Sequence, residues 1–231
     1  PAFSTELVVT NWSSSPKTLQ LTYVADAIGT PDHAAAATLA LAPGEQRIVP
    51  GFVDWMRRQG TAGIGPAGPT FAGGLFAEET GGDLGGVVLG ARVATPGGGG
   101  KFGLFFTARA VERQTDSALW VHGLQQNAET RTNLALVNLG QPGDVPDVFD
   151  VELYDGATGA LAATLSGVSL GPRAWRQFGA ILSVSAPGVT QGYAHVVRTA
   201  GASPFLVYGV LNDGAVPGER TGDGAFVWAV P

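Results

Sequence analysis

Hydrophobic and polar residues alternate with a period of two in several short stretches of the chain. In TLQLTYVAD, at residues 18–26, Leu19, Leu21 and Tyr23 share one face, and threonine and glutamine side chains share the other. The stretch FDVELYDG, at 149–156, alternates in the same way. Successive side chains of a β-strand point to opposite faces, so each stretch is expected to bury one face and expose the other. This behaviour is typical of strands in antiparallel sandwiches.

Other short apolar stretches, bounded by glycine and proline, predict the remaining strands. They lie at residues 5–11, 37–42, 45–50, 75–79, 86–94, 102–109, 118–125, 132–138, 161–170, 174–179, 192–199, 205–211 and 224–230. Helical periodicity occurs once and weakly, in GFVDWMRRQ at residues 51–59. The pattern predicts an all-β protein.

The same pattern of segments occurs twice. The matched segments are 4–11 with 131–138, 19–26 with 150–156, 39–49 with 168–178, and 85–110 with 204–230. Identity between the copies is low, but order and spacing hold along nearly the whole chain. Copies of about 110 residues each have the size of one immunoglobulin-like domain. We therefore expect two tandem immunoglobulin-like antiparallel β-sandwich domains from an internal duplication, at residues 1–113 and 114–231.

The second copy contains VHGLQQNAETRTNLALVNLG, VELYDGATGALAATLSGVSLGP and PFLVYGVLNDG, with TGDGAFV near its end. In these segments the chain resembles uncharacterised immunoglobulin-like β-sandwich modules that are repeated in secreted proteins of environmental bacteria. The resemblance covers most of the second copy and, more weakly, the first. It implies an extracellular or cell-surface location, and it brings no catalytic residues with it.

The two copies differ at their start. A strand at 118–125 leads into the second copy, as is common in the modules it resembles, whereas the first copy begins almost at its equivalent of the next strand. A missing strand would expose a row of backbone N–H and C=O groups at a sheet edge. Three explanations are open. The strand lies upstream of Pro1 in a longer protein, the domain closes without it or borrows from the linker, or a neighbouring molecule supplies it. A head-to-tail contact of the last kind builds an open filament unless it closes.

The amino-acid composition limits the classes of partner that the protein is expected to bind. The chain of 231 residues is 45% hydrophobic and 14% charged, which suits a packed core, and its net charge is −6. Lys17 and Lys101 are the two lysines, so no basic face for nucleic acid is expected.

The sequence contains no cysteine, which excludes disulfides and thiolate metal sites. It also contains no apolar run long enough to span a membrane. Because the chain starts at Pro1 and its one methionine is Met56, we expect a processed or truncated product.

Two glycine-rich stretches resemble nucleotide-binding loops only superficially. GIGPAG at 63–68 fits G-x-G-x-x-G, but Pro66 and Pro69 forbid the helix that such a site requires. TPGGGGKF at 95–102 lacks the first glycine and the final hydroxyl of a phosphate loop. We interpret it as the connection of a hairpin.

No catalytic, cofactor-binding or metal-binding residue is predicted, and the ligand-binding residues are unknown. The histidines His33, His122 and His195 are not at metal-ligand spacing. Two groups of acids, at Glu78, Glu79 and Asp83 and at Asp213, Glu219 and Asp223, are expected to be solvated loop residues. Calcium binding by residues 212–224 stays open. The sequon NWS at Asn11 is interpreted as a turn asparagine, because Asn11 aligns with Asn138.

Tryptophans offer candidates for stacking on sugars. Trp12 and Trp175 are the better surface candidates, whereas Trp120 and Trp228 are expected to be half-buried in strands.

We expect a non-catalytic extracellular structural or interaction protein without a cofactor, in its sharpest form a self-assembling filament subunit joined by strand complementation. Its expected partner is another copy of itself or another extracellular protein, with polysaccharide as a further candidate, no nucleic acid and no membrane span. The alternative is a carbohydrate- or protein-binding accessory module of a larger secreted protein.

Overall fold

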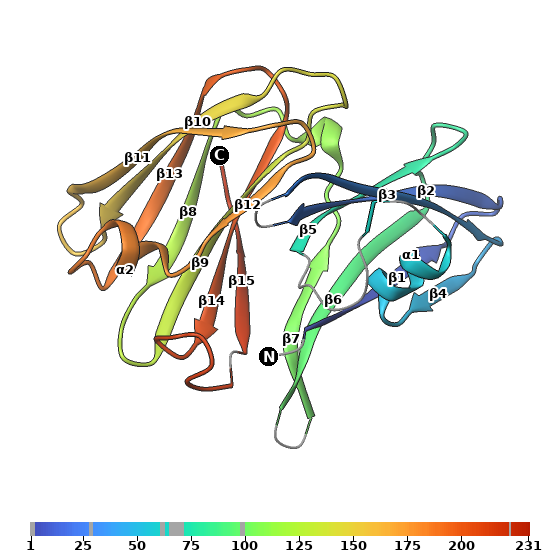
Figure 1. Cartoon of the computed structure of the whole chain (residues 1–231). Coiled ribbons are helices and arrows are strands. Elements are labelled where there is room, and N and C mark those ends of the chain that lie inside the picture. The colour runs from blue at the N-terminus through green and yellow to red at the C-terminus, as the bar shows by residue number, and fades with distance from the viewer. Residues whose placement is uncertain (1–2, 28–29, 61–62, 65–71, 98–99, 222) are drawn as a thin grey trace. The chain divides into compact units, whose positions relative to one another are not determined.

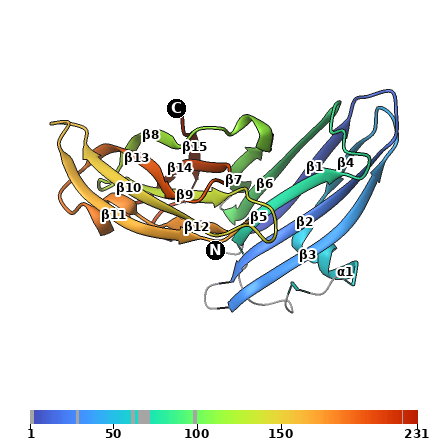
Figure 2. The same ribbon diagram turned by 90° about the horizontal axis from the view of Figure 1, so that it is seen from above.

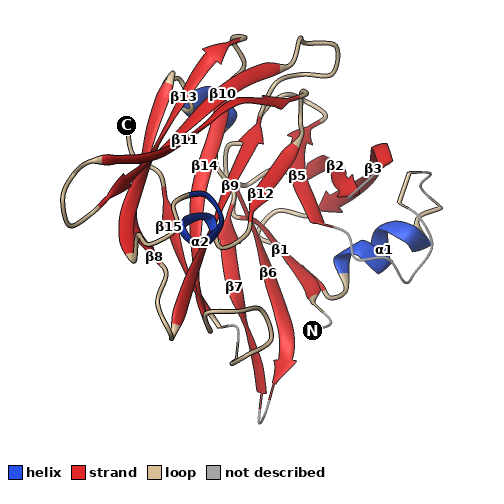
Figure 3. Ribbon diagram, turned by 60° about the vertical axis from the view of Figure 1, so that its left-hand side comes forward, coloured by secondary structure: helices blue, strands red, loops and turns tan. Residues whose placement is uncertain are grey.

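The computed structural model describes residues 3–27, 30–60, 63–64, 72–97, 100–221 and 223–231. Strands dominate the fold and pair antiparallel in every ladder, as Figure 3 shows in red. This confirms the predicted all-β class. The chain divides into two compact units, Pro1–Arg109 and Ala110–Pro231. The sequence placed the boundary after residue 113.

Unit 1 contains seven strands and one short helix in its described residues (Figure 1). They are β1 (Ser4–Asn11), β2 (Lys17–Ala27), β3 (Thr30–Leu41), β4 (Gln46–Val49), α1 (Phe52–Arg58), β5 (Ala72–Glu79), β6 (Val87–Gly97) and β7 (Gly100–Thr107). They form one sheet in the order β4-β1-β6-β7 and a second in the order β3-β2-β5.

The described part of unit 2 begins with the single turn η1 (Val111–Arg113) and continues with eight strands and one helix. They are β8 (Ala118–Gln125), β9 (Thr130–Asn138), β10 (Asp147–Asp155), β11 (Leu161–Leu170), β12 (Trp175–Phe178), α2 (Ile181–Ser185), β13 (Gln191–Ala200), β14 (Phe205–Asp213) and β15 (Gly224–Trp228). The sheets have the orders β12-β9-β14-β15 and β11-β10-β13-β8.

Strand order matches between the units at every position but one. The sheet β4-β1-β6-β7 corresponds to β12-β9-β14-β15, and β3-β2-β5 corresponds to β11-β10-β13, to which unit 2 adds β8. Each unit has one hydrophobic core, to which both of its sheets contribute side chains.

Two details of the predicted elements were wrong. β3 starts at Thr30, well before the predicted 37, because the alanines at 34–37 carry no polar–apolar alternation although they pair along β2. The helix α2 was not expected, since its five residues are too few to show a helical period.

A buried asparagine ties the two sheets together at the same place in each unit. The Asn11 Nδ2 donates hydrogen bonds to the carbonyl oxygens of Ser15 (2.8 Å) and Ala42 (3.0 Å), and its Oδ1 accepts from the Ser13 N–H (3.1 Å). The Asn138 Nδ2 donates to the Leu170 carbonyl oxygen (2.9 Å), and its Oδ1 accepts from the Gly140 N–H (2.7 Å). Each asparagine thus links the end of β1 or β9 to the end of β3 or β11 in the other sheet.

We predict that Asn11→Ala and Asn138→Ala each destabilise their unit by about 1–3 kcal/mol, because a buried carbonyl oxygen and a turn N–H lose their partners. Denaturant unfolding measures this. Trp12→Ala is the control: Trp12 is adjacent to Asn11 but 69% exposed, so its replacement should leave stability nearly unchanged. Equal stability of the asparagine variants and the wild type would contradict the assignment.

Candidate functional site

β8 is the strand that distinguishes unit 2 from unit 1, and it makes hydrogen bonds on both of its sides. On one side it pairs with β13, from Ala118 opposite Val197 to Gln125 opposite Gln191. On the other side the Trp120 N–H donates to the Val230 carbonyl oxygen (2.7 Å), and the Val230 N–H donates to the Trp120 carbonyl oxygen (2.8 Å). β8 therefore pairs with β13 on one side. On the other side it bonds to Val230, which follows β15, the last strand of the opposite sheet.

The side chains of β8 also complete the core. Leu119, Val121 and Leu124 are buried and belong to the hydrophobic cluster of unit 2. A Cβ added to Gly209 of β14 would lie 3.3 Å from the Val121 Cγ1, so β8 packs closely against the opposite sheet. Burial of each such side chain stabilises a fold by about 1.5–3 kcal/mol.

In unit 1, β5 takes the place that β13 has in unit 2. It pairs with β2 from Asp26 opposite Ala72 to Leu19 opposite Glu79, and the strands β3, β2 and β5 run side by side in Figure 2. Within the described residues, no strand pairs with the other side of β5. The backbone groups that point away from β2 therefore form an edge without the partner that β8 gives to β13.

The inward side chains beside this edge are less buried than their counterparts. Leu75 and Ala77 of β5 lie opposite Tyr23 and Leu21, just as Ala194 and Val196 of β13 lie opposite Leu153 and Val151. The side chains of Ala194 and Val196 are fully buried (0% exposed), whereas those of Leu75 and Ala77 are partly exposed.

The opposite sheet shows the same contrast. Leu89 and Ala91 of β6 pair with the fully buried Val9 and Leu7 and so face the core, yet both are partly exposed. Their counterparts in β14 are Val207 and Gly209, which are buried. We call the strand β5, which includes Leu75 and Ala77, together with Leu89 and Ala91 of β6 the open edge. Sequence analysis predicted that an edge strand was lacking but did not assign these residues to the edge, because residues 74–79 lie in none of the matched segments.

The first group of predicted acids serves the turn after β5. The Lys17 Nζ lies 3.2 Å from the Asp83 Oδ2 and also donates to the Asp83 carbonyl oxygen (2.7 Å). A hydrogen bond from the Gly85 N–H, followed by the contact with Lys17, lowers the pKa of Asp83. The Glu79 carboxylate accepts from the Gly81 N–H. A general acid at neutral pH needs a raised pKa, so Asp83 is not placed for that role.

Asp213 and Asp223 of the second group line a hollow of about 350 Å³ together with Glu129 and Arg220. Glu219 is not among the lining residues, and its carboxylate accepts a hydrogen bond from the Val216 N–H (3.2 Å). The Arg220 guanidinium lies 3.6 Å from the Glu129 carboxylate and 3.7 Å from that of Asp213. A hydrogen bond from the Thr221 hydroxyl is the largest cause of the lowered pKa of Asp213. Across the described ranges, no group of three or more His, Asp or Glu side chains is arranged to hold a metal ion. Arg220 already supplies the positive charge that a cation would bring to these acids.

The two glycine-rich stretches belong to unit 1. Residues 65–68 of GIGPAG lie outside the described residues, and Ile64 is buried in the core of unit 1. TPGGGGKF connects β6 to β7, with Pro96 opposite Lys101 and Gly97 opposite Gly100. The hairpin interpretation of this stretch is confirmed.

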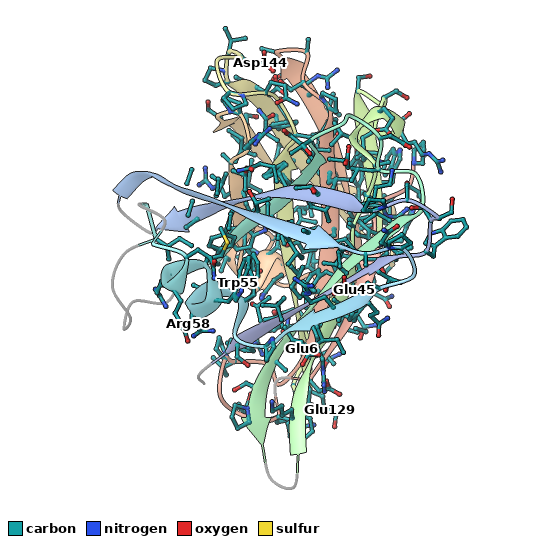
Figure 4. The ribbon with its side chains drawn as sticks, turned by 90° about the vertical axis from the view of Figure 1, so that its right-hand side faces the viewer. Glu6, Glu45, Trp55, Arg58, Glu129 and Asp144 are labelled. Carbon is teal, nitrogen blue, oxygen red and sulfur yellow. The ribbon has the colours of Figure 1, made fainter. Side chains whose placement is uncertain are left out.

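The tryptophans fall into different environments. Trp12 is exposed, as predicted, and Trp175 is half-buried, with its Nε1 donating to the Tyr208 hydroxyl (2.7 Å). Trp55, labelled on α1 in Figure 4, stacks on Phe52 with ring centroids 5.8 Å apart. Trp120 is half-buried on β8, close to His195 of β13, with ring centroids 3.9 Å apart. His122 is exposed on β8, and His33 lies outside the residues whose side chains are described.

Comparison with known proteins found no matching family model, no matching curated protein and no matching solved structure. In the part of the chain that the structure describes, no helix has the length and apolar character needed to cross a membrane. The candidate site therefore depends on the geometry of the two units alone.

We predict that a lysine is tolerated at the open edge but not at the equivalent position in unit 2. Val196→Lys places a charge in a closed core and should cost about 3–5 kcal/mol. Ala77→Lys should cost about 1 kcal/mol or less, because its ammonium group can reach water past β5. Denaturant unfolding of both variants measures the difference. Equal destabilisation of the two would show that the edge of unit 1 is closed.

Proposed function

We propose that the protein is a non-catalytic extracellular structural protein whose first unit takes up a β-strand from another copy, so that copies join into a filament. In this proposal each unit is an immunoglobulin-like β-sandwich, and the two units arose by duplication. The observation that carries it is the open edge, at the place where β8 completes unit 2.

Matching local geometry supports the duplication. Gly44 and Arg173, which follow the aligned prolines Pro43 and Pro172, both have left-handed backbone, with φ of 71° and 62°. The residues before α1 and α2, Gly51 and Ala180, are also left-handed, with φ of 59° and 45°. A non-glycine residue seldom adopts this left-handed conformation, yet Arg173 and Ala180 adopt it where glycine stands in unit 1. Together with the buried asparagines, this agreement at two aligned positions favours a common origin of the two units.

The physical chemistry of sheet edges supports strand uptake. Backbone N–H and C=O groups at an edge can pair with an added strand, and alternate apolar side chains of that strand can pack beside it. At the open edge, no described strand pairs with the side of β5 that faces away from β2. The inward side chains of β5 and β6 beside it are apolar and partly exposed. A strand with the alternation of β8, apolar at every second position, is the kind of segment that fits.

The form of assembly follows from the asymmetry of the contact. A donor strand and an acceptor edge are different surfaces, so each copy can donate to one neighbour and accept from another. Such a head-to-tail contact extends into a filament unless its rotation closes a ring. The resemblance of the second unit to modules of secreted bacterial proteins supports the extracellular location.

A graft of β8 onto unit 1 tests the proposal directly. Asn11 corresponds to Asn138, so residues 118–130 are inserted before Ser4 in place of residues 1–3. We expect the grafted strand to cover the open edge, raise the unfolding midpoint of unit 1 by about 4–8 °C for each kcal/mol gained, and abolish self-association. Calorimetry and light scattering with electron microscopy measure the two effects.

The control graft has the same length but carries serine in place of Leu119, Val121 and Leu124, and it should neither stabilise unit 1 nor block assembly. Ala77→Lys should also block assembly, whereas Val88→Lys, at a position already 53% exposed outside the open edge, should not. A wild-type chain that stays monomeric at high concentration would refute self-assembly. A graft that leaves unit 1 unchanged would refute the acceptor site itself.

A further inference from the structure

A continuous row of aromatic side chains lies on the outer face of the sheet β11-β10-β13-β8 in unit 2. It consists of Trp120 from β8, Tyr193 and His195 from β13, and Tyr154 from β10. The residues next to them in sequence, such as Val121, Leu153 and Ala194, are fully buried, so the aromatic row points away from the core.

The rings of the aromatic row are in contact across strands. Trp120 stacks on His195 with centroids 3.9 Å apart and planes at 15°. Tyr154 stacks on Tyr193 at 5.0 Å and 5°. The Trp120 ring also lies 6.0 Å from that of Tyr154 and 5.9 Å from that of Tyr193. The Trp120 side chain therefore leans across the sheet and joins the two pairs into one surface.

A carboxylate is fixed at the centre of this surface. The Glu152 Oε2 accepts a hydrogen bond from the Tyr154 hydroxyl (3.0 Å) and lies 2.9 Å from the His195 Nδ1. The hydrogen bond with His195 and then that from Tyr154 lower the pKa of Glu152, so the group is an ionised acceptor. The Glu152 and His195 side chains are 31% and 20% exposed, which lets a ligand reach both.

Core packing does not explain the aromatic row. In unit 1 the positions equivalent to Glu152, Tyr154 and Tyr193 are Thr22, Val24 and Gly74, and that unit builds its sheet without them. Of the row, the His195 position alone has an aromatic counterpart there, Phe76. Apolar side chains gathered on the outer face of a sheet commonly mark an interaction surface. The aromatic row is therefore a feature of unit 2 added to a framework that does not need it.

We propose that the aromatic row binds a neutral polysaccharide chain. Tryptophan and tyrosine rings present flat apolar area on which the C–H faces of sugar rings can pack, with polar tips beside it. The Glu152 carboxylate, the tyrosine hydroxyls and His195 offer hydrogen bonds to sugar hydroxyl groups.

Shape and charge favour this ligand over others. The surface is the face of a sheet, which suits an extended chain better than a small molecule, whose sites are usually concave. A proline-rich peptide would call for an aromatic-lined groove. The ionised Glu152 and the net charge of −6 disfavour an anionic polysaccharide. The proposal is independent of strand uptake by unit 1.

Native affinity electrophoresis of the full chain tests the site, with gels that contain hydroxyethylcellulose, xylan, laminarin or dextran. We expect at least one of these polymers to retard the wild type. Trp120→Ala and Tyr193→Ala should each weaken binding about tenfold or more, since each removes a stacking surface. Trp12→Ala is the matched control, because it removes an exposed tryptophan in unit 1 and should leave retardation unchanged.

Circular dichroism of the variants confirms that each is folded, and Tyr193→Ala retains the test if Trp120→Ala fails to fold. Retardation that is lost in the aromatic-row variants and kept in Trp12→Ala supports the site. Retardation by none of the four polymers, or retardation unaffected by both aromatic-row variants, overturns it. Binding of a proline-rich peptide at the aromatic row without any retardation by polysaccharide overturns it as well.

Discussion

The backbone of an edge strand must find hydrogen-bond partners, and this constraint governs how the two units differ. In unit 2, β8 pairs with the edge strand β13 and exchanges hydrogen bonds with Val230 on its other side. Its side chains Leu119, Val121 and Leu124 are buried in the core. In the described residues of unit 1, β2 is the one strand that pairs with β5. The same strand order therefore yields one unit in which β8 pairs with the edge and one in which no described strand does.

Features shared by the units belong to the framework, and features found in one unit are where we place function. The buried asparagines, the left-handed turns and the cores recur in both. The open edge occurs in unit 1, and the aromatic row occurs in unit 2. A chain that joins its copies through one unit and adheres to polysaccharide through the other would combine both candidate roles considered from the sequence.

Local patterns predicted the strands well, because the alternation of Leu19, Leu21 and Tyr23 reports directly which face of β2 is buried. The alignment of Asn11 with Asn138 predicted turn asparagines, which accept hydrogen bonds from the Ser13 and Gly140 N–H groups. It did not predict that both side chains are buried and link the two sheets of their unit. Contacts between segments that are distant in the sequence were not predicted. The sequence does not show that Trp120 lies opposite His195, or that Trp175 donates to Tyr208 thirty-three positions later, because these contacts depend on strand register and order. Trp120 was therefore expected to be a half-buried strand residue and nothing more, whereas its half-burial reflects stacking on the outer face.

Hydrogen–deuterium exchange of backbone amides tests the central claim most directly, because it reports whether an edge is paired in solution. In dilute monomeric protein, amides of β5 that point away from β2 should exchange quickly, whereas amides of β13 that face β8 should be protected. The same β5 amides should become protected once the protein assembles. Slow exchange of β5 and β13 alike in the monomer would contradict the account, since the edge of unit 1 would then already be covered.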